Sequence, residues 1–137
     1  MKSTILAGTP AIATTATCVL ALAPGASAAP QACVSTNLTT GQSGAVGTIA
    51  YKSSTSSCID LNLTYSDDAN GTWEYYAGRL RNSNGTWFTC AKGYVYAADG
   101  SHSLNDSTYA LCTDVNDNVP FGVASAYDGF DTVTITH

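Results

Sequence analysis

Residues 58–65 read Cys58-Ile59-Asp60-Leu61-Asn62-Leu63-Thr64-Tyr65, and apolar side chains alternate with polar ones along them. Successive side chains of a β-strand point to opposite faces, so one face of this segment would carry its aliphatic and aromatic side chains. A period of two over eight residues is typical of a strand with one buried and one solvated face. This segment is the clearest strand signal in the chain.

The composition of the rest of the chain also favours strands over helices. Beyond residue 28 there are one glutamate, two lysines, two arginines and two glutamines, so the polar residues that stabilise helices are scarce. Threonine and tyrosine favour strands, while asparagine, aspartate and glycine favour turns. We therefore predict an all-β fold, a single small antiparallel sandwich or barrel with two disulfides.

A short internal echo predicts how the central strands connect. Asn70-Gly71-Thr72-Trp73 recurs as Asn84-Gly85-Thr86-Trp87. Asn-Gly is the strongest two-residue hairpin signal, because a type I′ turn requires positive φ at both central residues. Two such turns predict a meander of three antiparallel strands, at residues 58–66, 72–81 and 86–97.

The remaining segments are expected to complete the sheet. A leading arm covers residues 29–40, and a polar loop covers residues 98–107. Further strands are expected where apolar or β-branched residues lie between turn signals, at residues 45–52, 108–114, 121–126 and 132–136.

The first 28 residues have the layout of a secretory signal peptide. Met1-Lys2 supplies the positive charge, an apolar stretch ends at Ala23, and Ala26-Ser27-Ala28 is a small-residue cleavage site. We expect residues 1–28 to be removed and residues 29–137 to form a single secreted β domain. The expected location is therefore extracellular or at the cell surface.

The cysteine count agrees with export. Loss of Cys18 with the leader would leave Cys33, Cys58, Cys90 and Cys112, and an even number in a small exported chain predicts two disulfides. Three pairings are possible. We favour Cys33–Cys58, which joins the leading arm to the sheet, and Cys90–Cys112, which joins two neighbouring strands. A zinc site is disfavoured because no Cys-x-x-Cys pair occurs.

The charge balance limits which classes of partner are expected. Beyond residue 28 the chain has four basic and ten acidic residues, a net charge of −6. Nucleic acid is not an expected partner, because binding to phosphates needs clustered lysine and arginine. No second long apolar run follows the leader, so no membrane span is expected.

Few residues are arranged for catalysis or metal binding. Glu74, Arg79 and His102 are a candidate base, phosphate clamp and acid, but the acidic chain offers no basic groove for such a substrate. No Gly-x-Ser-x-Gly motif occurs. The oxygen-rich loops at residues 67–71 and 114–118 do not complete a calcium-binding pattern. We therefore expect no catalytic, cofactor-binding or metal-binding residues, and no enzymatic activity.

Aromatic residues form the candidate contact surface, which comprises Trp73, Tyr75, Tyr76 and Trp87. Trp73 and Tyr75 share one face of their strand, and Tyr76 takes the other. Two tryptophans at equivalent hairpin positions could form a stacking platform for sugars or a partner protein. The alternative, which we favour, is that the tryptophans fill a core poor in leucine and isoleucine, with Tyr75 or Tyr76 left at the surface.

Several short motifs resemble a known family. They are the leader ending in Ala26-Ser27-Ala28, the strand ending in Ile49-Ala50-Tyr51, the strand that opens at Cys58, and the segments Tyr75-Tyr76-Ala77-Gly78, Gly93-Tyr94-Val95-Tyr96-Ala97 and Cys112-Thr113-Asp114. Together they resemble the spore-associated protein A family of small secreted actinobacterial proteins. The likeness covers residues 44–114, and the tail from Asn116 onward departs from the pattern. The resemblance implies a cell-surface or spore-surface protein without known catalytic residues.

These observations lead to two expected functions. The first is a secreted, non-enzymatic protein that associates with the envelope of the producing cell or spore. The second is a small disulfide-bonded inhibitor or binding subunit directed at another extracellular protein, such as an enzyme or a secreted toxin complex. The chain lacks the Trp-Arg-Tyr loop of the proteinaceous amylase inhibitors, since Trp73-Glu74-Tyr75 carries the opposite charge at the central position.

Overall fold

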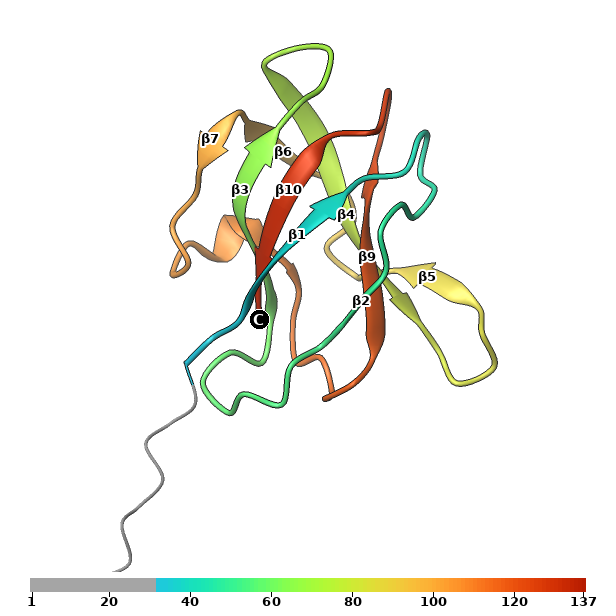
Figure 1. Ribbon diagram of the computed structural model, residues 1–137, viewed down its shortest axis with the longest axis vertical. Coiled ribbons are helices and arrows are strands. Elements are labelled where there is room, and N and C mark those ends of the chain that lie inside the picture. Colours follow the sequence, from blue (N-terminus) through green and yellow to red (C-terminus); the bar gives the residue numbers. More distant parts are fainter. Residues whose placement is uncertain (1–31) are drawn as a thin grey trace, which may run out of the picture.

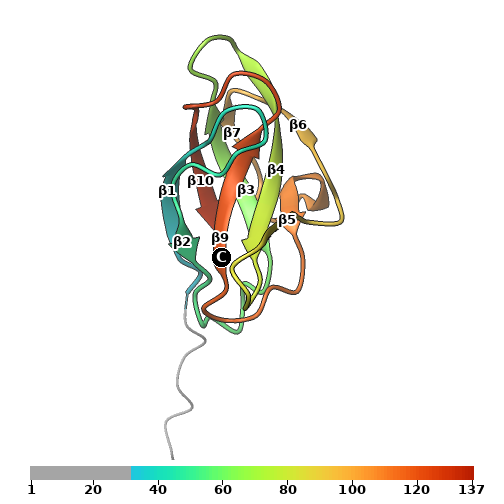
Figure 2. The ribbon, with the colours of Figure 1, turned by 90° about the vertical axis from the view of Figure 1, so that its right-hand side faces the viewer.

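Two antiparallel sheets form the framework of the described chain, residues 32–137 of a computed structural model (Figures 1 and 2). The strands are β1 (Ser35–Thr39), β2 (Ala50–Tyr51), β3 (Leu61–Asp67), β4 (Trp73–Arg81), β5 (Trp87–Thr89), β6 (Val95–Ala98), β7 (Gly100–Ser101), β8 (Ala110–Cys112), β9 (Pro120–Ser125) and β10 (Thr132–Thr136). A single turn of 3-10 helix, Ser107–Tyr109, precedes β8. The prediction of an all-β antiparallel fold, a sandwich or barrel, is confirmed, and the two sheets form a sandwich.

The chain changes sheet at most of its connections. The first sheet has the order β1-β10-β3-β7, with β8 also paired to β3. The second has the order β2-β9-β4-β5, with β6 also paired to β4. The connections from β3 to β4 and from β9 to β10 therefore cross between sheets, and both lie at the same end of the molecule (Figure 1).

The predicted three-stranded meander is wrong in its first half. β3 and β4 lie in different sheets, so Asn70-Gly71 does not form a hairpin turn. Gly71 does not have positive φ, which a type I′ turn would require. Instead the Asp68 side chain accepts a 3.0 Å hydrogen bond from the Asn70 amide, which turns the chain locally and directs it to the second sheet.

The second Asn-Gly turn does form a hairpin, between β4 and β5. Only Gly85 has positive φ, at 88°, and its amide donates to the Asn82 carbonyl. This geometry is a longer turn with a left-handed glycine rather than the predicted two-residue turn. The third predicted strand is interrupted, because β5 pairs with one half of β4 and β6 with the other.

The alternation at residues 58–65 holds only in part. Leu61 and Leu63 are buried as predicted, but Ile59 precedes the strand and is 50% exposed. A register shift between β3 and β10 falls at Leu63–Tyr65, so the strand changes face there. As a result Tyr65 points outward and Ser66 is buried.

The later strands follow the prediction more closely. β9 and β10 match residues 121–126 and 132–136 to within one residue, whereas the strand expected at 108–114 begins with the helical turn and is short. The strand expected at 45–52 is reduced to β2, and the chain before it covers the outer face of β9. A Cβ on Gly122 would lie 2.3 Å from Val46 Cγ1, which shows how closely this segment packs.

The core lies between the sheets. It combines aliphatic residues of both sheets with two large aromatic residues, Tyr76 and Phe121, which are fully buried. β10 contributes Val133 and Ile135, which alternate with exposed Thr132 and partly exposed Thr134. Thr136 at its end is buried. The core covers the inner face of β4, and Trp73 and Tyr75 on its outer face lie outside the core.

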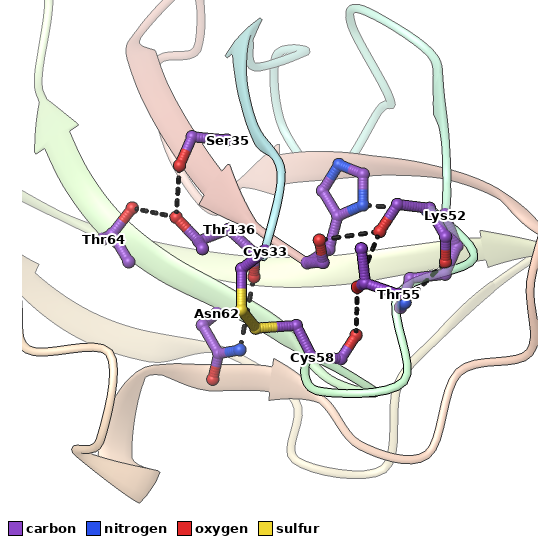
Figure 3. Close-up of a disulfide and its surroundings, with 10 residues drawn as sticks. Cys33, Ser35, Lys52, Thr55, Cys58, Asn62, Thr64 and Thr136 are labelled. Carbon is purple, nitrogen blue, oxygen red and sulfur yellow. Dashed lines mark hydrogen bonds between the residues drawn. A yellow bond between two sulfur atoms is a disulfide. The ribbon is translucent and has the colours of Figure 1, made fainter. Parts of the chain in front are cut away.

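The two disulfides are those favoured from the sequence. Cys33–Cys58 joins the leading arm to the segment before β3, beside hydrogen-bonded Ser35, Thr64 and Thr136 (Figure 3). Cys90–Cys112 links the end of the β4–β5 hairpin to β8, and therefore joins the two sheets. It passes so close to Gly78 that a Cβ there would lie 2.3 Å from Cys112 Sγ.

The expected signal peptide, residues 1–28, and Cys18 lie outside the described residues. Within residues 32–137, no helix has the length and apolar character needed to cross a membrane. The two internal disulfides are consistent with an oxidising, extracellular environment.

Candidate contact surface

Four aromatic rings gather on the outer face of the second sheet. We call Trp73, Tyr75, Tyr96 and Tyr127 the aromatic patch. The Trp73 ring centroid lies 5.9 Å from that of Tyr75 and 5.7 Å from that of Tyr96. Tyr75 is in turn 5.7 Å from Tyr96 and 6.3 Å from Tyr127. Trp73, Tyr96 and Tyr127 are 46%, 49% and 60% exposed, so the patch presents a continuous aromatic surface to solvent.

Strand pairing explains the patch. Trp73 and Tyr75 are two residues apart on β4 and share its outer face. Tyr96 on β6 lies directly opposite Tyr75, where aromatic side chains of neighbouring strands meet. Tyr127 comes from the β9–β10 connection, whose Ala126 amide donates to the Tyr75 carbonyl.

Two of the four residues predicted for the contact surface belong to the patch. Trp73 and Tyr75 do, but Tyr76 points to the other face of β4 and is fully buried, so its assignment to the surface is wrong. Trp87 faces Arg81 at the far end of β4, with the guanidinium 5.6 Å from its ring centroid. At about 3.4 Å per residue, roughly 27 Å of strand separates Trp73 from Arg81, so the tryptophans form no common platform.

The preference for tryptophan in the core is also wrong. Trp73 is nearly half exposed and Trp87 is partly exposed, because aliphatic residues with Tyr76 and Phe121 already fill the space between the sheets. The sequence did contain a signal for Tyr96, which alternates with buried Val95 and Ala97. Tyr127 had no local signal, since a hydrogen-bonded loop from another part of the chain brings it to the patch.

A buried carboxylate holds that loop in place. Glu74 is 2% exposed, and its Oε2 accepts hydrogen bonds from Ser125 Oγ at 2.8 Å and from the amides of Tyr127 and Asp128 at 3.2 and 3.3 Å. Ser43 Oγ also donates to the Tyr127 carbonyl. Glu74 therefore positions the patch, and its side chain is almost closed to solvent.

A second buried carboxylate fixes the neighbouring connections. Asp131 accepts hydrogen bonds from the Ala69 amide at 2.9 Å and from Thr40 Oγ1 at 3.3 Å. Burial raises the pKa of the Asp131 carboxyl, and the nearby negative charges of Asp68 and Glu74 raise it further. Burial also raises the pKa of Tyr76, whose hydroxyl has no hydrogen-bond partner within the described residues.

The catalytic candidates are not brought together. Glu74 and Arg79 are five residues apart on β4 and therefore lie on opposite faces, and the Arg79 guanidinium donates to the Gly44 carbonyl. His102 Nε2 lies 2.9 Å from Ser66 Oγ, a spacing that a nucleophile and its base would have. However, Ser66 is fully buried and its hydroxyl donates to the Ala98 carbonyl, so this oxygen is not placed to attack a substrate.

His137 occupies a second buried polar site. Its Nδ1 accepts a 2.9 Å hydrogen bond from the Ser53 amide, so the neutral ring carries its proton on Nε2, 3.0 Å from Thr36 Oγ1. Burial lowers the pKa of His137, as does nearby Lys52. Burial likewise lowers the pKa of His102, although Asp106 opposes that shift.

From the lowered pKa values of these two histidines we predict that the folded protein becomes less stable in mild acid. In the unfolded chain a histidine binds its proton near pH 6.5, whereas in the folded protein the pKa values of His102 and His137 are lower. The contribution of the two neutral histidines to folding stability is therefore complete above pH 6.5 and is lost as the pH falls toward the folded pKa values. The free energy of unfolding should decrease from pH 7.5 to pH 5.5, as measured by urea titration. The His137→Asn variant retains an acceptor for the Ser53 amide and should lose less stability over this range; an equal loss would contradict the assignment.

The aspartates of the acidic loops make local hydrogen bonds to backbone amides. Asp68 binds the Asn70 amide, and Asp60 accepts a 2.9 Å hydrogen bond from the Asp114 amide. Within residues 32–137, no group of three or more histidine, cysteine, aspartate or glutamate side chains is arranged to hold a metal ion.

Comparison of the chain with protein-family models, curated proteins and solved structures finds no match. The resemblance to the spore-associated protein A family therefore stays a prediction from short motifs.

Proposed function

We propose that this protein is a secreted, non-enzymatic binding domain that associates with the envelope of the producing cell or spore. The exposed aromatic patch carries this proposal. Exposed aromatic residues on a rigid scaffold are common anchors of binding surfaces, because their rings supply a large contact area at a small cost in conformational entropy.

Three further features support a role in binding. Hydrogen bonds to Glu74 and Ser43 hold Tyr127 in the patch before any partner arrives, which reduces the entropy lost on association. The signal-peptide layout of residues 1–28 predicts export, and the two disulfides suit an extracellular protein. The family motifs imply the surface of a cell or spore as the site of action.

Substitution of the patch should abolish envelope association. We expect the Trp73→Ala and Tyr96→Ala variants to lose at least nine-tenths of the binding to envelope fractions or spores of the producing organism, because each removes a ring near the centre of the patch. Sedimentation of the purified protein with these fractions measures the bound amount. Both side chains are about half exposed, so the variants should remain folded.

Phe88→Ala is the matched control, since Phe88 is also 46% exposed and lies on β5, outside the patch. It should bind like the parent. Undiminished binding by both patch variants, or no binding by the folded parent, would contradict the proposal.

A separate observation supports a second candidate function. An apolar hollow of about 350 Å³ lies beside the Cys90–Cys112 disulfide, lined by Leu80, Phe88 and Leu111 among others. Such a hollow suits an apolar side chain of another extracellular protein, as an inhibitor or binding subunit would require. Recovery of a stoichiometric protein partner from culture supernatant, lost with Phe88→Ala and retained with Trp73→Ala, would favour this function.

A further inference from the structure

The aromatic patch opens at one end into a small hollow. This hollow has a volume of about 250 Å³ and lies between the β3–β4 connection and the β9–β10 connection. Trp73 and Tyr127 contribute aromatic walls, while Asp68, Asn70 and Asp128 contribute polar groups. The volume is smaller than the roughly 300–1,000 Å³ of most small-molecule sites, so the hollow suits one ring of a longer ligand.

The polar groups of the hollow favour a ligand rich in hydrogen-bond donors. Ionised aspartates only accept hydrogen bonds, and no lysine or arginine lines the hollow. Within the described chain, the Asp128 carboxylate and Oδ2 of Asp68 make no hydrogen bond to another residue. These oxygens are therefore available, and their charge disfavours phosphates, sulfates and acidic sugars.

The ligand must also present an apolar face to the rings. A pyranose sugar meets both requirements, because its C–H groups can lie on an aromatic ring while its hydroxyls donate hydrogen bonds at the edge. The remaining rings of the patch continue from the hollow across β4 and β6, which offers a flat path for further sugar units.

We infer that the aromatic patch and this hollow bind a neutral sugar chain, with one pyranose ring between Trp73 and Tyr127 and its hydroxyls hydrogen-bonded to Asp68 and Asp128. This inference rests on the proposed function and names the chemistry of the envelope component. The walls are fixed in advance, since Glu74 holds the Tyr127–Asp128 backbone and the Asp99 side chain accepts a 2.9 Å hydrogen bond from the Asp68 amide.

Calorimetric titration of the folded protein with defined oligosaccharides tests the inference. The probes are the β-1,4-linked hexamers of glucose and of N-acetylglucosamine, both neutral, with the glucosamine hexamer as the cationic probe and an oligogalacturonate as the anionic one. We expect at least one neutral hexamer to bind with a dissociation constant below about 1 mM, and the anionic probe to bind at least tenfold more weakly. Raising the salt from 50 to 500 mM should change the neutral affinity less than twofold, because no ion pair forms.

Matched variants locate the binding. Trp73→Ala should weaken the neutral hexamer at least tenfold, and Asp128→Ala should weaken it severalfold through the lost acceptor. Phe88→Ala should leave the affinity unchanged. Absence of binding by both neutral hexamers, equal binding by the Trp73→Ala variant, or salt-sensitive binding of the cationic probe alone would overturn the inference.

The outcome separates this inference from the proposed function. If envelope binding requires Trp73 but the neutral hexamers neither bind nor compete, the sugar assignment fails and the proposed function stands. If the hexamers bind at Trp73 while the envelope does not bind the protein, the proposed function fails and the sugar site stands.

Discussion

Replacement of both Cys90 and Cys112 by alanine should lower the free energy of unfolding by about 4–5 kcal/mol. The bridge spans 22 residues, for which the chain-entropy model gives about 3.4 kcal/mol. Both cysteines are buried between the sheets, so lost packing adds roughly 1 kcal/mol. Because small domains are stable by only about 5–15 kcal/mol, this loss is a large share of the total. Urea unfolding followed by tryptophan fluorescence measures it.

The other bridge should matter less. Cys33 is only partly buried and joins the leading arm rather than the two sheets, so its replacement together with Cys58 should cost only the chain-entropy contribution, about 3.5 kcal/mol for a bridge that spans 25 residues. A greater loss of stability for this pair than for Cys90 and Cys112 would show that the Cys90–Cys112 bridge has no packing role.

Gly78 provides a control for that packing role. In the parent, Gly78→Ala would place a Cβ 2.3 Å from Cys112 Sγ and 3.1 Å from Leu111 Cβ, and should destabilise the fold. In the variant with alanine at positions 90 and 112, Gly78→Ala should lower the free energy of unfolding by at least about 1 kcal/mol less than in the parent. This difference is within the range of interaction energies for residues in contact. Strict additivity of the changes would contradict this close approach.

Loss of the Glu74 side chain should also have a large effect, about 3 kcal/mol for Glu74→Ala. The substitution removes the acceptor for Ser125 Oγ and for the Tyr127 and Asp128 amides. A buried donor left without a partner costs about 1–3 kcal/mol, and water can reach the exposed loop, which limits the total. Equilibrium unfolding gives the loss, and amide exchange at Tyr127 and Asp128 should become faster.

Glu74→Gln is the matched comparison. Glutamine keeps the volume and one acceptor oxygen but places an NH₂ group near the Tyr75 amide, which now donates to the carboxylate at 2.5 Å. It should cost about 1–2 kcal/mol, less than alanine. Unchanged amide exchange in both variants would show that Glu74 does not hold the loop.

Local sequence signals predicted the features that depend on local chemistry. The period of two and the shortage of helix formers indicated an all-β fold, and Asn84-Gly85 marked a real hairpin. The favoured cysteine pairs were correct because each joins segments that are close along the chain. β10 was predicted to the residue, since Thr132–Thr136 alternates strictly and follows the turn residues Asp128-Gly129.

Long-range pairing could not be predicted in the same way. Asn70-Gly71 resembles the second turn in sequence, yet it carries the chain to the other sheet, and only pairing with β10, β7 and β8 shows where β3 belongs. The contact surface was half predicted for the same reason. Alternation separated Tyr75 from Tyr76 but did not show which face the core would cover, and Tyr127 depends on its contact with Glu74.

Hydroxyl-radical footprinting of the protein on isolated envelope shows whether the aromatic patch is the surface that binds. The rates of oxidation at single aromatic side chains, read by mass spectrometry, are compared between free and bound protein. We expect protection of the aromatic patch, with unchanged rates at Tyr51 and Phe88, which lie outside the patch and are 58% and 46% exposed. Protection of Phe88 or Tyr51 with unchanged rates at Trp73, Tyr96 and Tyr127 would contradict it.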